Sequence, residues 1–183
     1  MATWKDKRKV MRSYDVTADI YEERYSDEQQ RKYEKALEKV AVSGKLLLDV
    51  GCGSGLFFRE VAEDALMAVG VDISRKLLLK ARGQAKAFLN AFLLQADADH
   101  LPFKKGYFDE VFAFTVLQNM PNPNETLIEL KRVINLKGRF VVTGLKKAFP
   151  LEKFMDILEK SGLHLTAFVD DEDVNCYVAV LVA

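Results

Sequence analysis

The sequence has few cysteines and no long apolar run. Its 183 residues include two cysteines, Cys52 and Cys176, which lack a C-x-x-C spacing. Isolated cysteines of this kind predict neither a metal site nor a disulfide framework, and they are typical of a reducing cytosol. No apolar stretch reaches the roughly 20 residues that cross a bilayer, and no apolar leader follows the start. We therefore expect a cytoplasmic protein that does not bind membranes.

The chain also lacks an excess of charge of either sign. Lys+Arg and Asp+Glu number 27 each, so nothing in the overall charge favours nucleic acid or an anionic surface as a partner. The one local bias is the basic start, with Lys5, Lys7, Arg8 and Lys9, which we interpret as a solvated or frayed end. The length and the apolar fraction of 49% predict one soluble globular domain spanning 1–183.

The most informative stretch is a glycine-rich turn after a short apolar strand, 46–50. Gly51, Gly53 and Gly55 alternate there, and a helical pattern begins directly after them. Glycine accepts positive φ and lets the backbone approach a ligand closely. Strand, glycine turn and helix form the first unit of an α/β nucleotide-binding fold. A dinucleotide site would need a third glycine where Leu56 stands, so the turn does not match G-x-G-x-x-G.

From Lys45 onward the pattern alternates short apolar strands with helices. We predict strands at 46–50, 67–72, 92–97, 108–115, 139–144, 164–169 and 176–182. Helices are predicted after the glycine turn, after a Ser74 cap, between Pro123 and about Gly138, and from Pro150 to Gly162. The last two strands are joined too closely for a crossover and must be antiparallel. The prediction is an α/β fold: a doubly wound, mostly parallel seven-stranded sheet with a C-terminal antiparallel hairpin.

Two helices are predicted before the first strand. A stripe on the first contains Tyr14, Ala18, Tyr21, Arg24 and Tyr25 at three- and four-residue steps. Ser26 or Asp27 would cap the second helix, which ends before Gly44. We expect residues 1–44 to form a helical lid over the carboxyl ends of the strands of a core at 45–183, although passive packing on the sheet edge is an alternative.

The turn, with Asp49 before its glycines, resembles motif I of the class I S-adenosylmethionine (SAM)-dependent methyltransferases. The strand order along the chain resembles that family too, and the resemblance covers residues 45–183. It implies SAM as the cofactor and S-adenosylhomocysteine (SAH) as the product. It places Gly51, Cys52, Gly53 and Gly55 against the cofactor, with no chemistry for Cys52 because the family varies there.

The resemblance also assigns roles at the ends of the next strands. Asp72 would accept both ribose hydroxyls, and Ile73 would lie against the adenine. Asp97 would accept the adenine amino group while the Ala98 N–H meets a ring nitrogen, with Leu101 and Phe103 as walls. Asp49 would help to hold the methionine ammonium, or would bond the turn itself.

Two further segments complete the predicted site. Residues 114–121 take the place of motif IV, where many relatives have histidines and this chain has Gln118 and Asn119. Thr115, at the start of this segment, is expected to contact the cofactor. These amides can position a substrate but do not take up a proton near neutral pH. The segment beginning at Tyr14 resembles Y-D-x-x-A-x-x-Y, which implies that Tyr14, Tyr21 and Arg24 fold over the methionine carboxylate. Packing of this helix face is the alternative.

These observations predict a SAM-dependent methyltransferase that moves a methyl group by in-line displacement to an unidentified acceptor. A small molecule is favoured, because the net charge is zero and the sequence shows no appended binding domain. An RNA or protein acceptor is the first alternative. The second is a non-catalytic SAM-binding subunit or sensor that works with a partner protein, suggested by the missing histidine base.

Overall fold

The protein is described by a computed structural model that covers residues 4–18 and 21–182, without the side chains of residues 21–25. Within these residues the chain forms a seven-stranded sheet in the order β3-β2-β1-β4-β5-β7-β6. Its strands are β1 (Leu46–Val50), β2 (Met67–Asp72), β3 (Ala91–Gln95), β4 (Phe108–Ala113), β5 (Ile134–Leu145), β6 (His164–Val169) and β7 (Cys176–Val182). β1 to β5 are parallel, whereas β7 is antiparallel to both β5 and β6. The predicted fold class is confirmed.

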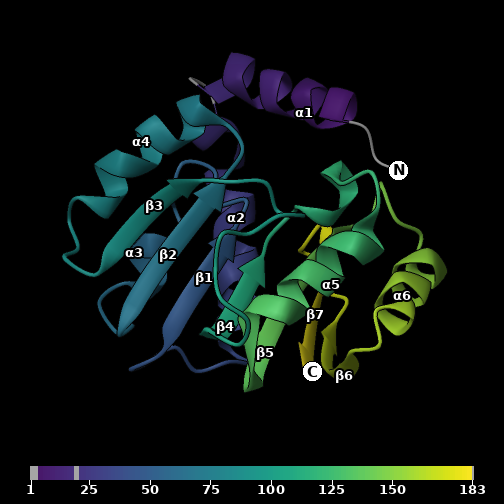
Figure 1. The fold of residues 1–183 in the computed structure, drawn as a ribbon. Coiled ribbons are helices and arrows are strands. Elements are labelled where there is room, and N and C mark those ends of the chain that lie inside the picture. Colours follow the sequence, from purple (N-terminus) through teal and green to yellow (C-terminus); the bar gives the residue numbers. More distant parts are fainter. Residues whose placement is uncertain (1–3, 19–20, 183) are drawn as a thin grey trace.

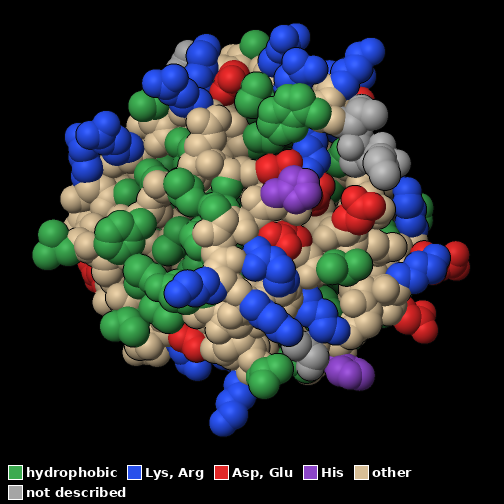
Figure 2. All heavy atoms as spheres, viewed as in Figure 1, with side chains coloured by type: hydrophobic (Ala, Val, Ile, Leu, Met, Phe, Trp, Pro, Cys, Tyr) green, Lys and Arg blue, Asp and Glu red, His purple; other side chains and the backbone are tan. Residues whose placement is uncertain are grey.

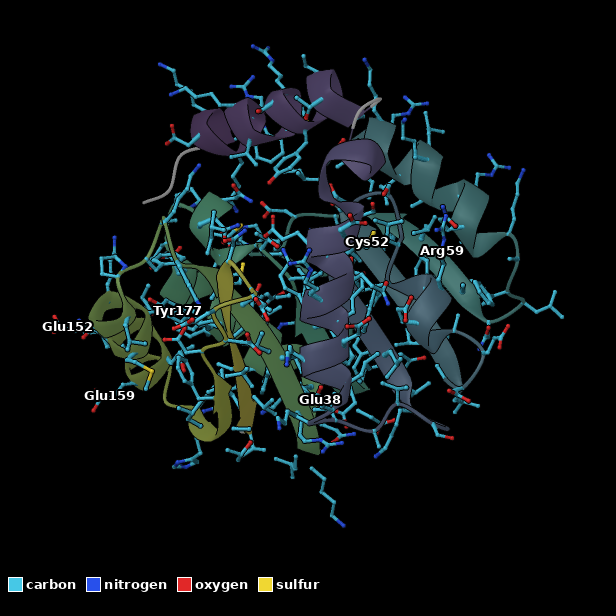
Figure 3. The ribbon with its side chains drawn as sticks, turned by 180° about the vertical axis from the view of Figure 1, so that it is seen from behind. Glu38, Cys52, Arg59, Glu152, Glu159 and Tyr177 are labelled. Atoms are coloured by element: carbon cyan, nitrogen blue, oxygen red, sulfur yellow. The ribbon has the colours of Figure 1, made fainter. Side chains whose placement is uncertain are left out.

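Helices cover the sheet on both faces and at one end. They are α1 (Trp4–Thr17), α2 (Tyr21–Leu37), α3 (Phe58–Val61), α4 (Arg75–Ala85), α5 (Pro123–Val133) and α6 (Leu151–Lys160), with a short 3₁₀ turn, η2 (Leu117–Asn119). Figure 1 shows α1 across the top, above the arrowheads of β1 and β2, with α5 and α6 on the near face. Seen from behind, α2 crosses the sheet with α3 and α4 beside it (Figure 3). In the described part of the chain, no helix is both long and apolar enough to span a membrane.

The order of the sheet creates the site. The chain moves from β1 outward to β3 and then returns to the other side of β1 at β4. Neighbouring crossovers therefore leave in opposite directions, which opens a crevice at the carboxyl ends of β1 and β4. α1 lies over this crevice (Figure 1).

An aromatic cluster fixes the glycine turn to the sheet. Phe57, two residues after Gly55, is buried, and its ring centroid lies 4.7 Å from that of Phe112 on β4 and 5.0 Å from that of Phe114. Tyr33 of α2 joins the cluster at 4.9 Å from Phe57. Because protein interiors are densely packed, these contacts hold the start of α3 and the turn in a defined position.

The first helical boundary differs from the prediction. α1 ends at Thr17, and α2 runs from Tyr21 through Ser26 and Asp27, so neither of these residues caps a helix. Near the end of α1 the Thr17 hydroxyl donates to the Ser13 carbonyl at 3.0 Å, a local bond that competes with helix continuation. The basic start is also not frayed, because it forms α1 and buries Lys7.

The boundary between α5 and β5 was also predicted wrongly. α5 ends at Val133 and β5 begins at Ile134, whereas we expected the helix to reach Gly138. Ile134 pairs with Phe108 of β4, so sheet pairing takes over directly after the helix. A Cβ on Gly138 would lie 2.7 Å from the Asp109 carbonyl oxygen, so this glycine allows two strands to approach and does not end a helix.

One face of the outer strands is left uncovered. The described chain passes from β3 to β4 without a helix, which leaves Phe92 and Leu94 exposed. Together with Phe103 and Tyr107 they line a shallow apolar groove. Figure 2 shows apolar side chains gathered on this side, over β2 and β3.

Candidate functional site

A cavity with about 710 Å³ of empty space, including its open mouth, lies at the carboxyl ends of the strands under α1. We call it the main cavity. Its lining comes from the glycine turn, the ends of β2, β3 and β4, and the inner face of α1: Lys7, Val10, Tyr14, Val50, Gly51, Gly53, Val71, Asp72, Ile73, Leu77, Ala96, Asp97, Ala98, Phe114, Thr115, Val116, Asn119 and Met120.

Asp72 lies at the end of β2 with its carboxylate in the main cavity. One oxygen accepts from the Gly53 N–H at 2.9 Å and the other from the Ser74 N–H at 2.7 Å. Burial nevertheless raises the pKa of Asp72 above its usual value. Since a carboxylate has about four acceptor positions, two remain for a ligand with adjacent hydroxyl groups.

Asp97 and its neighbours form the next part of the wall. Ile73, Asp97 and Ala98 all line the main cavity, as the resemblance implies. Leu101 and Phe103 do not wall it: Leu101 belongs to the buried core, and the Phe103 ring packs against that of Phe108 at 4.9 Å. Val10 and Leu77 supply apolar surface to the main cavity instead.

A second, smaller cavity of about 260 Å³ adjoins the turn and contains Asp49. The Ser54 hydroxyl also lines it and is buried without a hydrogen-bond partner among the described residues. Burial, together with the charge of Asp72, raises the pKa of Asp49 to about 8. Two buried carboxyl groups whose charged forms are destabilised favour a cationic ligand.

Asp49→Asn should remove a pH dependence of stability. The folded protein holds a proton on Asp49 between its ordinary pKa of 3.8 and about 8, and the unfolded chain does not. The free energy of unfolding must therefore fall as the pH rises across this window. Thermal unfolding at pH 5 and pH 9 is expected to show a smaller loss for the variant than for the wild type. Equal losses would show that Asp49 is ionised in the fold throughout.

The three glycines of the turn have different roles. All have positive φ, at 72° for Gly51, 56° for Gly53 and 80° for Gly55. A Cβ on Gly51 would lie 2.6 Å from Cγ2 of Val116, so this position admits no side chain. Gly55 lines neither cavity, because it faces Ala81 of α4 at 3.0 Å, where it allows close helix packing.

Cys52, also in the turn, lines the second cavity and is buried beside β2. Figure 3 shows it behind α2, at the end of the sheet where α1 lies. Burial and the charge of Asp49 raise the pKa of its thiol well above the ordinary value. A thiol held in its protonated form is a poor nucleophile, which agrees with assigning it no chemistry.

Thr115 organises the end of β4. It has φ 60°, which is uncommon for a residue other than glycine. Its N–H donates to the Thr143 hydroxyl at 2.7 Å, and its hydroxyl accepts from the buried Lys32 at 3.0 Å. Its carbonyl accepts from the side-chain amides of Gln118 at 2.5 Å and Asn119 at 3.0 Å.

Gln118 and Asn119 therefore differ in their access to the main cavity. Asn119 lines the main cavity and donates to the Tyr14 hydroxyl of α1 at 2.9 Å. Gln118 turns away from this lining, and its Oε1 is buried with no hydrogen-bond partner in the described structure. The geometry brings Asn119 to the site directly, and Gln118 only through Thr115.

Sequence reasoning missed Lys7 and Val10, which line the main cavity with Tyr14. The available signal was their spacing, because positions 7, 10 and 14 share one helix face. Tyr21 and Arg24 were predicted to contact the cofactor, but their side chains lie outside the described residues. Asp15 was also missed: it accepts from the Ser74 hydroxyl at 2.6 Å and so joins α1 to α4.

Together, the doubly wound sheet, the glycine turn and the strand-end acids define a class I SAM-dependent methyltransferase. A family model described as a methyltransferase domain matches residues 48–142, and the chain belongs to that family, whose cofactor is SAM.

Curated relatives agree with this assignment. The chain is 31% identical over 147 residues to malonyl-[acyl-carrier protein] O-methyltransferase of Legionella pneumophila, covering 78% of this chain and 52% of that protein. It is 29% identical over 191 residues to demethylmenaquinone methyltransferase of Thermobifida fusca, covering 98% and 80% respectively. The chain spans about half the length of the first relatives it matches.

Solved structures share the fold. Magnesium protoporphyrin IX methyltransferase of Synechocystis, solved with bound SAM, superposes with a TM-score of 0.82 at 18% identity, covering 100% of this chain and 99% of that one. A chain from the complex of the Haloferax volcanii Trm112 methyltransferase activator has a TM-score of 0.79 at 19% identity, covering 93% and 97%. At such identities the likeness concerns the fold alone.

Proposed function

We propose that this chain transfers a methyl group from SAM to a small-molecule acceptor, as one domain in which residues 1–44 form the lid. The observation that carries the proposal is the main cavity, in which Asp72 and Asp97 at consecutive strand ends face the glycine turn.

The residues present fit the ribose, the adenine and the ammonium group of SAM. Asp72, with two free acceptor positions, would hold the two ribose hydroxyls, and Asp97 would receive the adenine amino group. Gly51 and Gly53 let the backbone approach the ligand. Asp49 and Ser54 in the second cavity would hold the methionine ammonium, whose positive charge would compensate the buried carboxylate of Asp49.

The acceptor would approach between α1 and the end of β4. SAM presents a methyl group on a positively charged sulfur, so the transfer depends chiefly on orientation. Asn119 and Tyr14, bonded to each other, would orient the acceptor, and Thr115 would fix Asn119 through its carbonyl. Lys7, Val10 and Tyr14 of α1 line the main cavity, and α1 runs across this end of the sheet (Figure 1), which favours an acceptor small enough to enter beneath it.

Calorimetric titration with SAH, with NAD as the control, tests the cofactor site. We expect SAH to bind with micromolar affinity and NAD not to bind. Incubation with SAM and pools of small acceptors then tests turnover by the appearance of SAH. Binding of NAD without SAH would overturn the proposal, and an RNA acceptor methylated in preference to every small molecule would overturn its choice of acceptor.

An RNA acceptor is the second candidate, favoured by the outer face of α1. Lys5, Arg8, Lys9 and Arg12 are all exposed there, and Lys and Arg side chains gather along the top of the molecule (Figure 2). Related sequences include a tRNA U34 carboxymethyltransferase of Photobacterium profundum, 31% identical over 119 residues.

Neutralising Lys5, Arg8 and Arg12 together should weaken any RNA binding and flatten its salt dependence, because fewer counterions would be released. Three lost phosphate contacts would reduce the magnitude of the slope of log K against log salt by about 2 for a single strand. Filter binding at several salt concentrations measures this. Lys7 is left out of the variant, since it faces the cavity. RNA affinity that did not change would remove this candidate.

A non-catalytic SAM-binding subunit is the third candidate. It is supported by the absence of a histidine at Gln118 and Asn119, and by the uncovered groove at Phe92 and Leu94 where a partner protein can pack. Fold neighbours include a [4+2]-cyclase, SpnF, at a TM-score of 0.71, so the fold alone does not settle the reaction. Formation of SAH from SAM with any acceptor would exclude this candidate.

A further inference from the structure

Lys7 of α1 places its ammonium group between two acids of the site. Its Nζ lies 2.8 and 2.7 Å from the two carboxylate oxygens of Asp97, and 2.5 Å from Oδ2 of Asp99. The Lys7 side chain is 8% exposed although it belongs to the basic start of the chain. Burial alone would lower the pKa of Lys7, but the bonds to Asp97 and Asp99 outweigh it and raise the pKa. The lysine is therefore a firmly held cation.

Two other contacts hold α1 in the same position. Tyr14 accepts from Asn119 at 2.9 Å, and Asp15 accepts from the Ser74 hydroxyl at 2.6 Å and the Lys76 N–H at 3.3 Å. These contacts join α1 to the end of β4 and to the start of α4, on either side of the main cavity. Among these three residues of α1, Lys7 is the one that bonds to Asp97.

We propose that Lys7 is a latch of the lid: it occupies the carboxylate of Asp97, and the adenine amino group must displace it when SAM binds. This rests on the proposed function, which places the adenine amino group at Asp97. The latch couples cofactor entry to release of the first half of α1.

Lys7 and the adenine amino group compete because most acceptor positions of the Asp97 carboxylate are already occupied. One Asp97 oxygen accepts from Lys7 and from the Asp99 N–H at 3.0 Å, and the other accepts from Lys7. Three of about four acceptor positions are taken, and the ammonium lies in front of both oxygens. The adenine amino group would donate to the same two oxygens, in front of which the Lys7 ammonium already lies, so it competes with Lys7 for Asp97. The apparent affinity for SAM equals the intrinsic affinity multiplied by the fraction of molecules in which Asp97 is free.

The test is calorimetry of Lys7→Met and wild type with two ligands, SAH and S-inosylhomocysteine, which has a carbonyl oxygen in place of the 6-amino group. If the latch holds Asp97 in nine of ten molecules, Lys7→Met should bind SAH about tenfold more tightly. The same variant should bind S-inosylhomocysteine several-fold more weakly, because Lys7 can donate to the carbonyl. Lys160→Met, which removes an exposed ion pair with Asp156 on α6, should change neither affinity.

A latch predicts that Lys7→Met changes the affinities for the two ligands in opposite directions, whereas a purely structural role of Lys7 predicts changes in the same direction. Affinities that fall together, or an equal affinity for SAH in both proteins, would overturn the latch while leaving the cofactor in place. Absence of SAH binding in the wild type would overturn the proposed function, and the latch with it. If Lys7→Met did not fold, hydrogen exchange of wild-type α1 would decide: faster exchange around Lys7 on adding SAH supports the latch, and slower exchange refutes it.

Discussion

Asp72→Ala is expected to weaken SAH binding by about 2–3 kcal/mol, roughly 30- to 150-fold. In the variant the two ribose hydroxyls would lose the carboxylate that accepts from them, and hydrogen bonds to a charged group are stronger than neutral ones. Asp97 would be left as the other carboxylate of the main cavity. Calorimetry of the wild type and the variant measures the change.

Alanine is the right replacement because both oxygens of Asp72 accept backbone N–H groups, from Gly53 and Ser74. An asparagine would place its own NH₂ group against one of these two backbone N–H groups, and this repulsion would disturb the glycine turn. Asp64→Ala is the matched control, since Asp64 is exposed and lies outside both cavities. A folded Asp72→Ala protein that bound SAH as tightly as this control would show that the ribose assignment is wrong.

Phe112→Ala should destabilise the fold by about 3–5 kcal/mol, as for other large-to-small changes of buried aromatic residues. Phe112 has no exposed surface, and its ring lies 4.7 Å from that of Phe57 and 5.8 Å from that of Phe114. The lost contacts would leave a cavity under the glycine turn. Urea unfolding with linear extrapolation gives the free energy of unfolding.

Phe92→Ala provides the comparison on the same sheet. Phe92 is 52% exposed, so its removal should cost less than about 1 kcal/mol. SAH affinity should also fall in Phe112→Ala and stay constant in Phe92→Ala, because Phe57 of the same cluster follows the turn. Equal costs for the two variants would contradict the role of the cluster.

The sequence predicted parts of the site because each signal comes from residues that are close together in the chain. The apolar run of β1, the alternating glycines and the acids that close β2 and follow β3 lie within short stretches, so one sequence is enough to find them. Parallel strands bring their carboxyl ends to one edge of a sheet, which is why Asp72 and Asp97 could be expected together. The Ser74 cap was confirmed: its hydroxyl accepts from the Leu77 N–H at 3.2 Å.

The predicted helix boundaries were wrong where contacts with residues distant in the sequence determine them. Gly138 is typical of a helix end, but in the structure it lies against the Asp109 backbone of β4. Pairing with β4 extends β5 back to Ile134. Ser26 reads as a cap, yet α2 runs through it. Leu101 and Phe103 were expected at the adenine, but one packs in the core and the other against Phe108.

The sequence by itself determined the succession of strands and helices, the glycine turn and the acids at the strand ends, because each depends on residues close together in the chain. The tertiary structure alone decided the environment of Lys7, whose partners Asp97 and Asp99 stand about ninety residues further on. A lysine in a basic segment is ordinarily solvated, and only two facing carboxylates make its burial favourable. The same holds for Asp49, whose pKa depends on burial and on Asp72, and neither can be read from its position in the chain.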